Sequence, residues 1–220
     1  MDQRRALLMR SELLAAFDPP TLAQLARTAR TLTLRRNDSL FLEGDPGDEL
    51  YVVSRGRIAI VKRATDGRES VVALMEDGAL FGEMALFDGQ GRSAEARALE
   101  SSEVLAVPYP PIHEALEDHP LVLWHVVALL GARLRAADDA LADSMFLDVT
   151  GRTAKRLLEL AGEADEFSLP VTQEELAGLV GASRERVNKA ISTFARLGWL
   201  EQEDRRYRIL DRAQLSRRAR

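Results

Sequence analysis

The sequence contains no cysteine, and this absence excludes several kinds of chemistry together. Without thiolates the chain cannot form a disulfide, use a thiol nucleophile, or hold a thiolate zinc site or a cysteine-ligated iron–sulfur cluster. Its three histidines, His113, His119 and His125, all follow the segment that we predict below to be rich in strands, so that segment has no histidine ligand for haem. We therefore expect no metal, haem or iron–sulfur cluster.

Long apolar runs and catalytic motifs are also missing. The run over residues 121–130 is interrupted by His125 and is shorter than the roughly 18 residues of a membrane span. Residues 1–10 hold three arginines, but neither the apolar core nor the cleavage site of a signal peptide follows. We expect a cytoplasmic location and no membrane partner. There is no nucleophile–base–acid arrangement, metal-ligand cluster or Walker-type loop, so we expect no catalytic residue and no enzyme activity.

Charge is distributed unevenly along the 220 residues. Residues 184–220 contain eleven arginines and lysines against five acidic residues, a net charge of +6. Since the whole chain carries −5, the remaining residues carry −11. An acidic body with a basic end is typical of a protein that presents only that end to a polyanion such as DNA. A solvated basic tail is the alternative that charge alone leaves open.

The segment over residues 31–107 predicts short strands. Apolar runs rich in β-branched residues alternate with glycine-containing turns about every ten residues. Asp66-Gly67, between the runs 58–61 and 71–74, is a hairpin signal. We expect an antiparallel β-roll of jelly-roll type, preceded by a short helix over residues 20–29.

After Pro120 the pattern changes to that of one long helix. Its seam positions recur at spacings of four and three, as in a coiled coil, and are Leu123, Val127, Leu130, Leu134, Ala137, Leu141 and Ser144. Packing on the chain's own β-roll is one outcome for such a seam. Its length of about three heptads favours a second copy of the same helix, so we predict a homodimer through residues 119–147.

The last third of the chain predicts a winged helix-turn-helix domain. Residues 148–152 interrupt the seam as a hinge, helix follows over 153–161, and a charged loop follows over 162–170. Thr172 and Glu175 have the spacing of a capping box that begins a helix. A tight turn over 181–183 separates this helix from a second one, and two strands around 204–205 suggest a wing. The predicted buried stripes of the two helices are Leu176, Leu179 and Val180, and Val187, Ala190, Ile191, Phe194 and Leu197.

The second of these helices has the composition of a DNA-recognition helix. With its apolar stripe buried, Arg184, Glu185 and Lys189 share the outward face with Asn188. Arginine and lysine suit guanine O6 and N7, and glutamate accepts from cytosine N4. Ser183 and Thr172, at the two helix starts, are placed to contact phosphates. A charged helix face that is merely solvated is the alternative reading.

Residues 81–86 and 91–94 form the chemical centre of the strand-rich segment. Gly82 allows backbone amides to approach an anion, and the short helix that includes Met84 can direct N–H groups at phosphate. Arg92 and Ser93 supply charge and further donors, and Glu83 suits a ribose 2′-hydroxyl. The combination predicts a phosphate-plus-sugar site, with a structural ion pair between Glu83 and Arg92 as the alternative.

The sequence resembles the CRP/FNR family of transcription regulators, and most closely its members that resemble the cAMP receptor protein. Residues 180–189, VGASRERVNK, look very like the family helix-turn-helix, and residues 146–152, FLDVTGR, are similar to its hinge. The spacing of Glu83 and Arg92 resembles the family's phosphate-binding cassette. The resemblance extends over nearly the whole chain.

The resemblance implies an allosteric regulator that binds double-stranded DNA under the control of cAMP. It implies cAMP contacts from the cassette and from Arg133, and a TGTGA-like palindrome read by Arg184, Glu185 and Lys189. Arg186 stands where the family often has threonine, and is expected to add a phosphate contact. RNA polymerase is the further partner that the resemblance implies.

The adenine end of the implied site departs from the family, which places threonine and then serine there. Ala137 and Asp138 occupy these positions, and alanine can neither donate nor accept a hydrogen bond. Asp138 can accept from adenine N6 but repels guanine O6, which favours cAMP over cGMP. An effector-independent regulator with a vestigial pocket remains an alternative, as does a protein-interaction module.

These expectations define an α+β chain with three parts. Residues 1–118 are predicted to form a cyclic-nucleotide-binding-like sensor, residues 119–147 a dimerisation helix, and residues 148–220 a winged helix-turn-helix DNA-binding domain.

Overall fold

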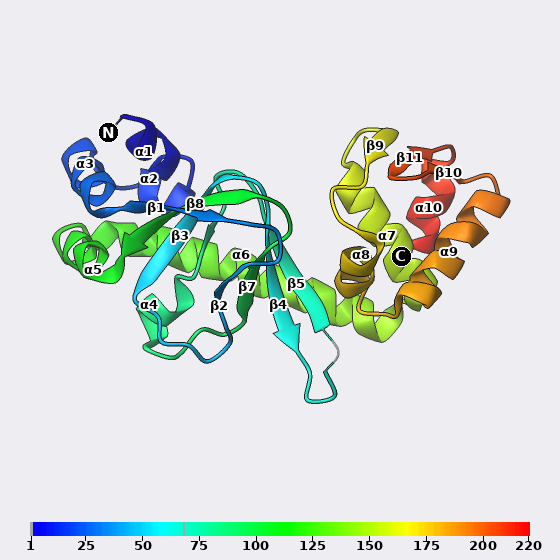
Figure 1. Ribbon diagram of the computed structural model, residues 1–220, viewed down its shortest axis with the longest axis horizontal. Helices are drawn as coiled ribbons and strands as arrows, with labels where there is room; N and C mark the ends of the chain where they lie inside the picture. Colours follow the sequence, from blue (N-terminus) through cyan, green and yellow to red (C-terminus); the bar gives the residue numbers. More distant parts are fainter. Residues whose placement is uncertain (1, 68) are drawn as a thin grey trace. The chain divides into compact units, whose positions relative to one another are not determined.

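The computed structural model describes residues 2–67 and 69–220 and divides into two compact units. The first unit is Met1–Asp66 with Val72–Leu134, and the second is Gly67–Val71 with Arg135–Arg220 (Figure 1). The mixed helix and strand composition confirms the predicted α+β class. The sequence-based division into three parts stays a prediction.

The first unit is built on two antiparallel sheets that form a β-roll. One sheet has the order β1-β8-β3-β6 and the other β2-β7-β4-β5. Their strands are β1 Arg30–Leu34, β2 Ser39–Phe41, β3 Glu49–Arg55, β4 Ile58–Arg63, β5 Glu69–Met75, β6 Leu80–Phe81, β7 Glu95–Ala98 and β8 Ser102–Pro108. The runs of β-branched residues pair as predicted, because β4 and β5 are hydrogen-bonded neighbours on either side of the Asp66-Gly67 turn.

Short helices flank the β-roll. They are α1 Asp2–Leu8, α2 Glu12–Ala15, α3 Pro19–Thr28, α4 Met84–Asp88 and α5 Tyr109–Asp118, followed by the 3-10 turn η1 Pro120–Val122. The predicted helix after Pro19 is confirmed: Asp18 caps α3 by accepting from the Thr21 amide, and its apolar side enters the core.

Helix α6, Leu123–Phe146, exposes its heptad seam in the single chain. Leu123, Val127, Leu134 and Leu141 are 45–63% exposed, whereas Val126 on another face is buried. The seam is therefore not packed on the chain's own β-roll. The expectation that no segment is long and apolar enough for a membrane span is wrong. Among the described residues, Pro120–Phe146 is long and apolar enough to cross a membrane, by length and composition, and an 18-residue window within it has a mean hydropathy of 1.3.

The second unit is a helical domain with a small sheet. Its elements are α7 Val149–Ala161, β9 Glu166–Ser168, α8 Gln173–Val180, α9 Arg184–Arg196, β10 Leu200–Glu203, β11 Arg206–Ile209 and α10 Arg212–Arg218. The three strands pair antiparallel in the order β10-β11-β9. The helix-turn-helix and its wing are confirmed.

Three details of this unit differ from the sequence-based expectations. The interruption after α6 is only Leu147 and Asp148, since Asp148 accepts from the Gly151 amide and thereby begins α7 four residues earlier than predicted. The predicted loop over 162–170 contains β9, which is too short to show a strand period. Leu197, at the end of α9, is 51% exposed rather than buried, because the helix ends before it.

Helix α8 shows a smaller difference in its buried stripe. Ala177 is buried there beside Leu176 and Val180, and Leu179 is only half-buried. An alanine is a weak signal in a hydrophobic pattern because it is common on either face of a helix.

Candidate functional site

The predicted pocket residues come together between β6 and β7 of the first unit. Gly82 follows β6, Glu83 immediately precedes α4, and Arg92 and Ser93 precede β7. Gly82 adopts a left-handed backbone with φ of 79°, and a Cβ added there would lie 2.9 Å from Nη1 of Arg92. A glycine is therefore required for the approach of the guanidinium to this backbone.

Arg92 is buried, and its hydrogen-bond acceptors in the described part of the chain are neutral oxygens. Its Nη1 donates to the Gly82 carbonyl at 2.7 Å and to the Tyr109 hydroxyl at 2.9 Å, and its Nη2 donates to the Glu49 carbonyl at 2.8 Å. The guanidinium carbon lies 4.4 Å from the centroid of the Phe41 ring. Among the described residues, Nε has no hydrogen-bond partner and no ion pair involves Arg92. A buried cation without a counter-ion attracts an anion.

Glu83 is the complementary buried group. Its residue is 0% exposed, and its Oε1 lies 2.5 Å from Nη1 of Arg133, which also donates from Nη2 to the Leu80 carbonyl. Oε1 is therefore held by the Arg133 guanidinium, whereas Oε2 has no hydrogen-bond partner in the described part of the chain. Burial raises the pKa of the Glu83 carboxyl, and the Arg133 guanidinium opposes this rise.

The alternative of an ion pair between Glu83 and Arg92 is wrong, because Glu83 pairs with Arg133 from α6 instead. Two other predicted residues lie at the surface of the first unit. The Ser93 hydroxyl donates to the Met84 sulfur at 3.5 Å, and both residues are exposed. Asp138 is exposed on α6, in the second unit.

The residues present fit a cyclic nucleotide. The Arg92 Nε needs an acceptor, and Oε2 of Glu83 needs a donor. A phosphate supplies the first and a ribose hydroxyl the second, so one ligand satisfies both buried groups. The described residues contain no cluster of three or more potential metal ligands.

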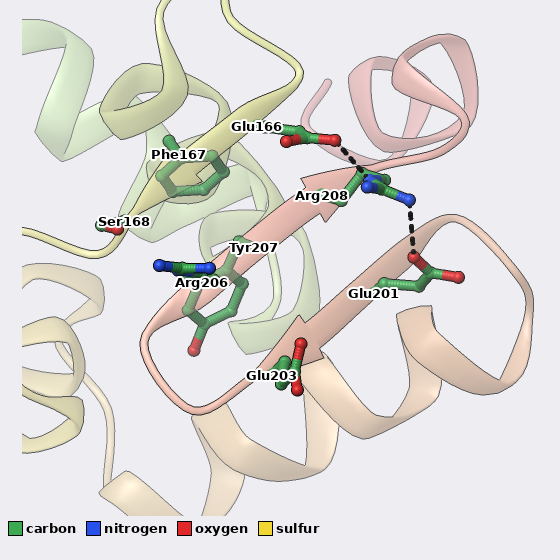
Figure 2. Close-up of a pocket in the computed structure, with 8 residues that line it drawn as sticks. All are labelled: Glu166, Phe167, Ser168, Glu201, Glu203, Arg206, Tyr207 and Arg208. Carbon is green, nitrogen blue, oxygen red and sulfur yellow. Dashed lines mark hydrogen bonds and ion pairs between the residues drawn. The ribbon is translucent and has the colours of Figure 1, made fainter.

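A hollow of about 430 Å³ lies on the sheet of the second unit and does not share this chemistry (Figure 2). Arg208 pairs there with Glu166 at 2.6 Å and with Glu201 at 3.6 Å. With Glu203 and Arg206, the lining has three carboxylates and two guanidinium groups. The excess of negative charge is unfavourable for a nucleotide or for DNA.

Helix α9 presents a charged face and buries an apolar one. Val187, Ala190, Ile191 and Phe194 are buried, and the Phe194 ring stacks on Trp199 with centroids 5.9 Å apart. The outward residues Arg184, Glu185, Arg186 and Lys189 are all exposed. No ion pair among the described residues uses these four side chains, so their charges are available to a partner.

Both hydroxyl residues at the helix starts act as caps. The Thr172 Oγ1 accepts from the Glu175 amide at 3.2 Å, the Thr172 amide donates to Glu175 Oε2 at 2.6 Å, and Ser183 Oγ accepts from the Arg186 amide at 3.4 Å. The predicted capping box is confirmed. A capping hydroxyl uses its oxygen and keeps its proton, so capping is compatible with donation to a phosphate.

Sequence reasoning missed several residues that support these sites. Tyr109, Phe41 and the Glu49 carbonyl surround Arg92 but lie far from it in sequence. Arg152 donates to the Leu147 carbonyl at 2.7 Å and to the Val180 carbonyl at 2.9 Å, which ties the interruption after α6 to the end of α8. Periodicity contains no signal for such bonds, because they depend on the tertiary approach of main-chain carbonyls.

A β-roll with a buried polar pocket, together with a winged helix-turn-helix, defines the class of ligand-sensing transcription regulators. Residues 31–119 match the cyclic nucleotide-binding domain model, and residues 151–218 match the Crp-like helix-turn-helix domain model. The chain is 36% identical over 221 residues to a "CRP-like cAMP-activated global transcriptional regulator" of Mycobacterium tuberculosis, covering 97% of this chain and 99% of the relative. This protein belongs to the CRP family of transcription regulators.

Other relatives support the same assignment. The "cAMP-activated global transcriptional regulator CRP" of Escherichia coli is 31% identical over 160 residues, which cover 70% of this chain and 76% of the relative. The structure of the c-di-GMP responsive regulator CLP from Xanthomonas campestris is similar with a TM-score of 0.76 and 25% identity, covering 87% of this chain and 99% of that one. These relatives are transcription regulators and not enzymes.

Proposed function

We propose that this protein is a homodimeric transcription regulator that binds a TGTGA-like palindrome under allosteric control by cAMP. The observation that carries the ligand half of the proposal is a pair of buried polar atoms without hydrogen-bond partners among the described residues, Arg92 Nε and Glu83 Oε2. The relatives named for activation by cAMP support this ligand.

Each pocket residue has a defined part in binding. The nucleotide supplies a phosphate charge and a ribose hydroxyl. Arg92 and Ser93 donate to the phosphate, while Glu83, oriented by Arg133, accepts from the hydroxyl. Asp138, through its carboxylate, accepts from the amino group of adenine.

The DNA half of the proposal rests on the unpaired charges of α9. Arg184, Glu185 and Lys189 read base edges in the major groove, while Arg186, Ser183 and Thr172 contact phosphates. A lysine in place of the usual arginine at position 189 loses bidentate geometry, so selectivity at that base is expected to be lower.

The exposed seam of α6 supports the homodimer. Its apolar positions follow a heptad spacing along one side of the helix. An apolar seam on one side suits a parallel partner helix, whereas a helix surrounded by lipid would be apolar on all sides. A twofold axis along α6 pairs the two recognition helices and explains a palindromic site. We further propose a cytoplasmic location and RNA polymerase as a protein partner.

Fluorescence anisotropy tests the proposal. The full chain is titrated onto a labelled TGTGA-palindrome duplex with and without cAMP, at fixed and stated salt. We expect cAMP to tighten binding by about 5- to 150-fold, the usual range of an allosteric coupling. By linkage, operator DNA must tighten cAMP binding in calorimetry by the same factor.

Two controls separate the alternatives. Cyclic di-GMP is tested beside cAMP, because a structurally similar regulator is described as responsive to it. Tight and specific DNA binding that ignores both nucleotides would support the effector-independent alternative, for which Ala137 is the sequence argument. Equal binding to a scrambled duplex would contradict the recognition role of α9.

A further inference from the structure

The hydroxyl group of Tyr109 joins two parts of the ligand pocket. Tyr109 is the first residue of α5, and it is 7% exposed. Its hydroxyl donates to the Gly82 carbonyl at 2.5 Å and accepts from Nη1 of Arg92 at 2.9 Å. A phenol has one proton and two lone pairs, so both bonds form together. The hydroxyl therefore links the pocket backbone to the buried guanidinium.

These bonds decide which donors of Arg92 remain. Both Nη1 hydrogens have acceptors, Gly82 and Tyr109, and one Nη2 hydrogen is donated to the Glu49 carbonyl. Among the described residues, Nε–H is the donor of Arg92 that has no partner. A charged N–H donor of this kind forms a strong hydrogen bond to a phosphate oxygen.

We propose that Tyr109 is a positioning residue for nucleotide binding, whose hydroxyl holds the Arg92 guanidinium so that its Nε–H is left for the phosphate. This inference rests on the proposed function and adds a residue to it. A free arginine side chain has many rotamers, and fixing one of them on binding costs entropy. Because Tyr109 fixes the guanidinium beforehand, that cost is reduced when the ligand binds.

Packing and orientation by Tyr109 can be separated experimentally. The ring belongs to the buried cluster that also contains Leu50, Val107 and Ile112. Tyr109→Phe keeps this packing, and the Gly82 carbonyl keeps its bond from Arg92. The substitution therefore removes the hydroxyl bond to Arg92 with little change in packed volume.

The test is calorimetric titration of cAMP into the wild-type chain and Tyr109→Phe. We expect about tenfold weaker binding in the variant, equivalent to about 1.4 kcal/mol. The same substitution is then made beside Arg92→Lys, which retains the charge but lacks the fork. There we expect less than about a twofold further loss, because the group positioned by Tyr109 is absent.

Tyr207→Phe is the matched control. Tyr207 is also buried, and its hydroxyl accepts from Gln173 at 2.6 Å in the second unit. We expect this variant to bind cAMP with wild-type affinity, and thermal unfolding confirms that each variant is folded. Equal or tighter cAMP binding by Tyr109→Phe would overturn the inference, as would an undiminished loss beside Arg92→Lys. If the wild-type chain itself binds no cAMP, the proposed function fails and this inference fails with it.

Discussion

The ligand pocket and the recognition helix use their charges in opposite ways. Glu83 and Arg92 are 0% and 4% exposed, and they are held by an ion pair or by internal hydrogen bonds. Arg184 and Lys189 on α9 are exposed and have no ion-pair partner among the described residues. Buried charges are costly to desolvate, so a pocket must fix them before the ligand arrives. Exposed charges stay hydrated and can adapt to DNA.

This contrast predicts how each site responds to substitution. A change in the pocket affects orientation, burial and stability together, since each side chain there has several internal partners. A substitution on the outward face of α9 mainly affects binding to a partner and has little effect on the stability of the chain. The following experiments test this difference, from the largest expected effect to the smallest.

Arg92→Ala is expected to have the largest effect. It removes a buried guanidinium that donates to three internal oxygens, and bonds to charged groups each contribute about 1.5–3 kcal/mol. We expect cAMP affinity in calorimetry to fall by at least about 100-fold, with a lowered melting temperature. Arg92→Lys is the control that keeps the charge. A change of less than about threefold in cAMP affinity would contradict the pocket assignment.

Arg184→Ala is expected to affect DNA binding without affecting folding. The variant should lose about 1–3 kcal/mol of affinity for the palindrome, because one base-edge contact is removed. Binding to a random duplex should be nearly unchanged, as should the melting temperature. Gel-shift titration on both duplexes measures the two affinities. Losses of equal size on the two duplexes would assign Arg184 to phosphate contact instead.

Thr172→Ala removes the cap of α8 and should destabilise the second unit by about 1 kcal/mol. Trp199 lies in that unit, so its fluorescence in a Trp124→Phe background reports the unfolding of the unit during urea titration. Thr193→Ala is a matched control within α9, where the hydroxyl donates to the Lys189 carbonyl and caps no helix start. If the two threonine variants unfold at the same urea concentration, the capping box contributes nothing measurable.

Glu83→Gln is expected to change the pH dependence of stability by a smaller amount. Burial raises the pKa of this carboxyl above its ordinary 4.5, although the Arg133 guanidinium opposes the rise. From pH 4.5 up to the raised pKa, the folded chain binds more protons than the unfolded chain, so its free energy of unfolding falls as pH rises. Glu83→Gln has no carboxyl at this position, so its free energy of unfolding lacks this fall with pH.

Urea denaturation at closely spaced pH values from 4.5 upward measures that difference. The stability of Glu83→Gln minus that of the wild type should increase with pH across the window. A constant difference would mean that the folded and unfolded pKa values of Glu83 are the same.

Much of the fold was predictable because it depends on local chemistry. The Asp66-Gly67 hairpin, the capping box at Thr172 and the left-handed Gly181 turn are set by residues within a few positions of one another. The charged face of α9 was predictable for the same reason. A helix that buries its apolar stripe must direct its other residues outward.

The expectations that failed have two causes, a partner distant in sequence and the exact end of a helix. The alternative to the phosphate-plus-sugar site paired Glu83 with Arg92, its neighbour in the chain, but Arg133 from α6 holds Glu83 instead. Leu197 continued the apolar spacing of α9, yet it is exposed because the helix ends before it. Local spacing states which residues share a face, but it does not state which segment packs against that face.

The sequence by itself determined the succession of a strand-rich segment, one long helix and a helix-turn-helix, the heptad seam of α6 and the outward charged face of the recognition helix, because these features follow from residue spacing and propensity. Only the tertiary structure decided that Tyr109, Glu49 and Gly82 meet around Arg92. A buried guanidinium takes whatever oxygens the folded chain brings within about 3 Å of it. Such partners come from main-chain carbonyls and distant side chains, which no local pattern encodes.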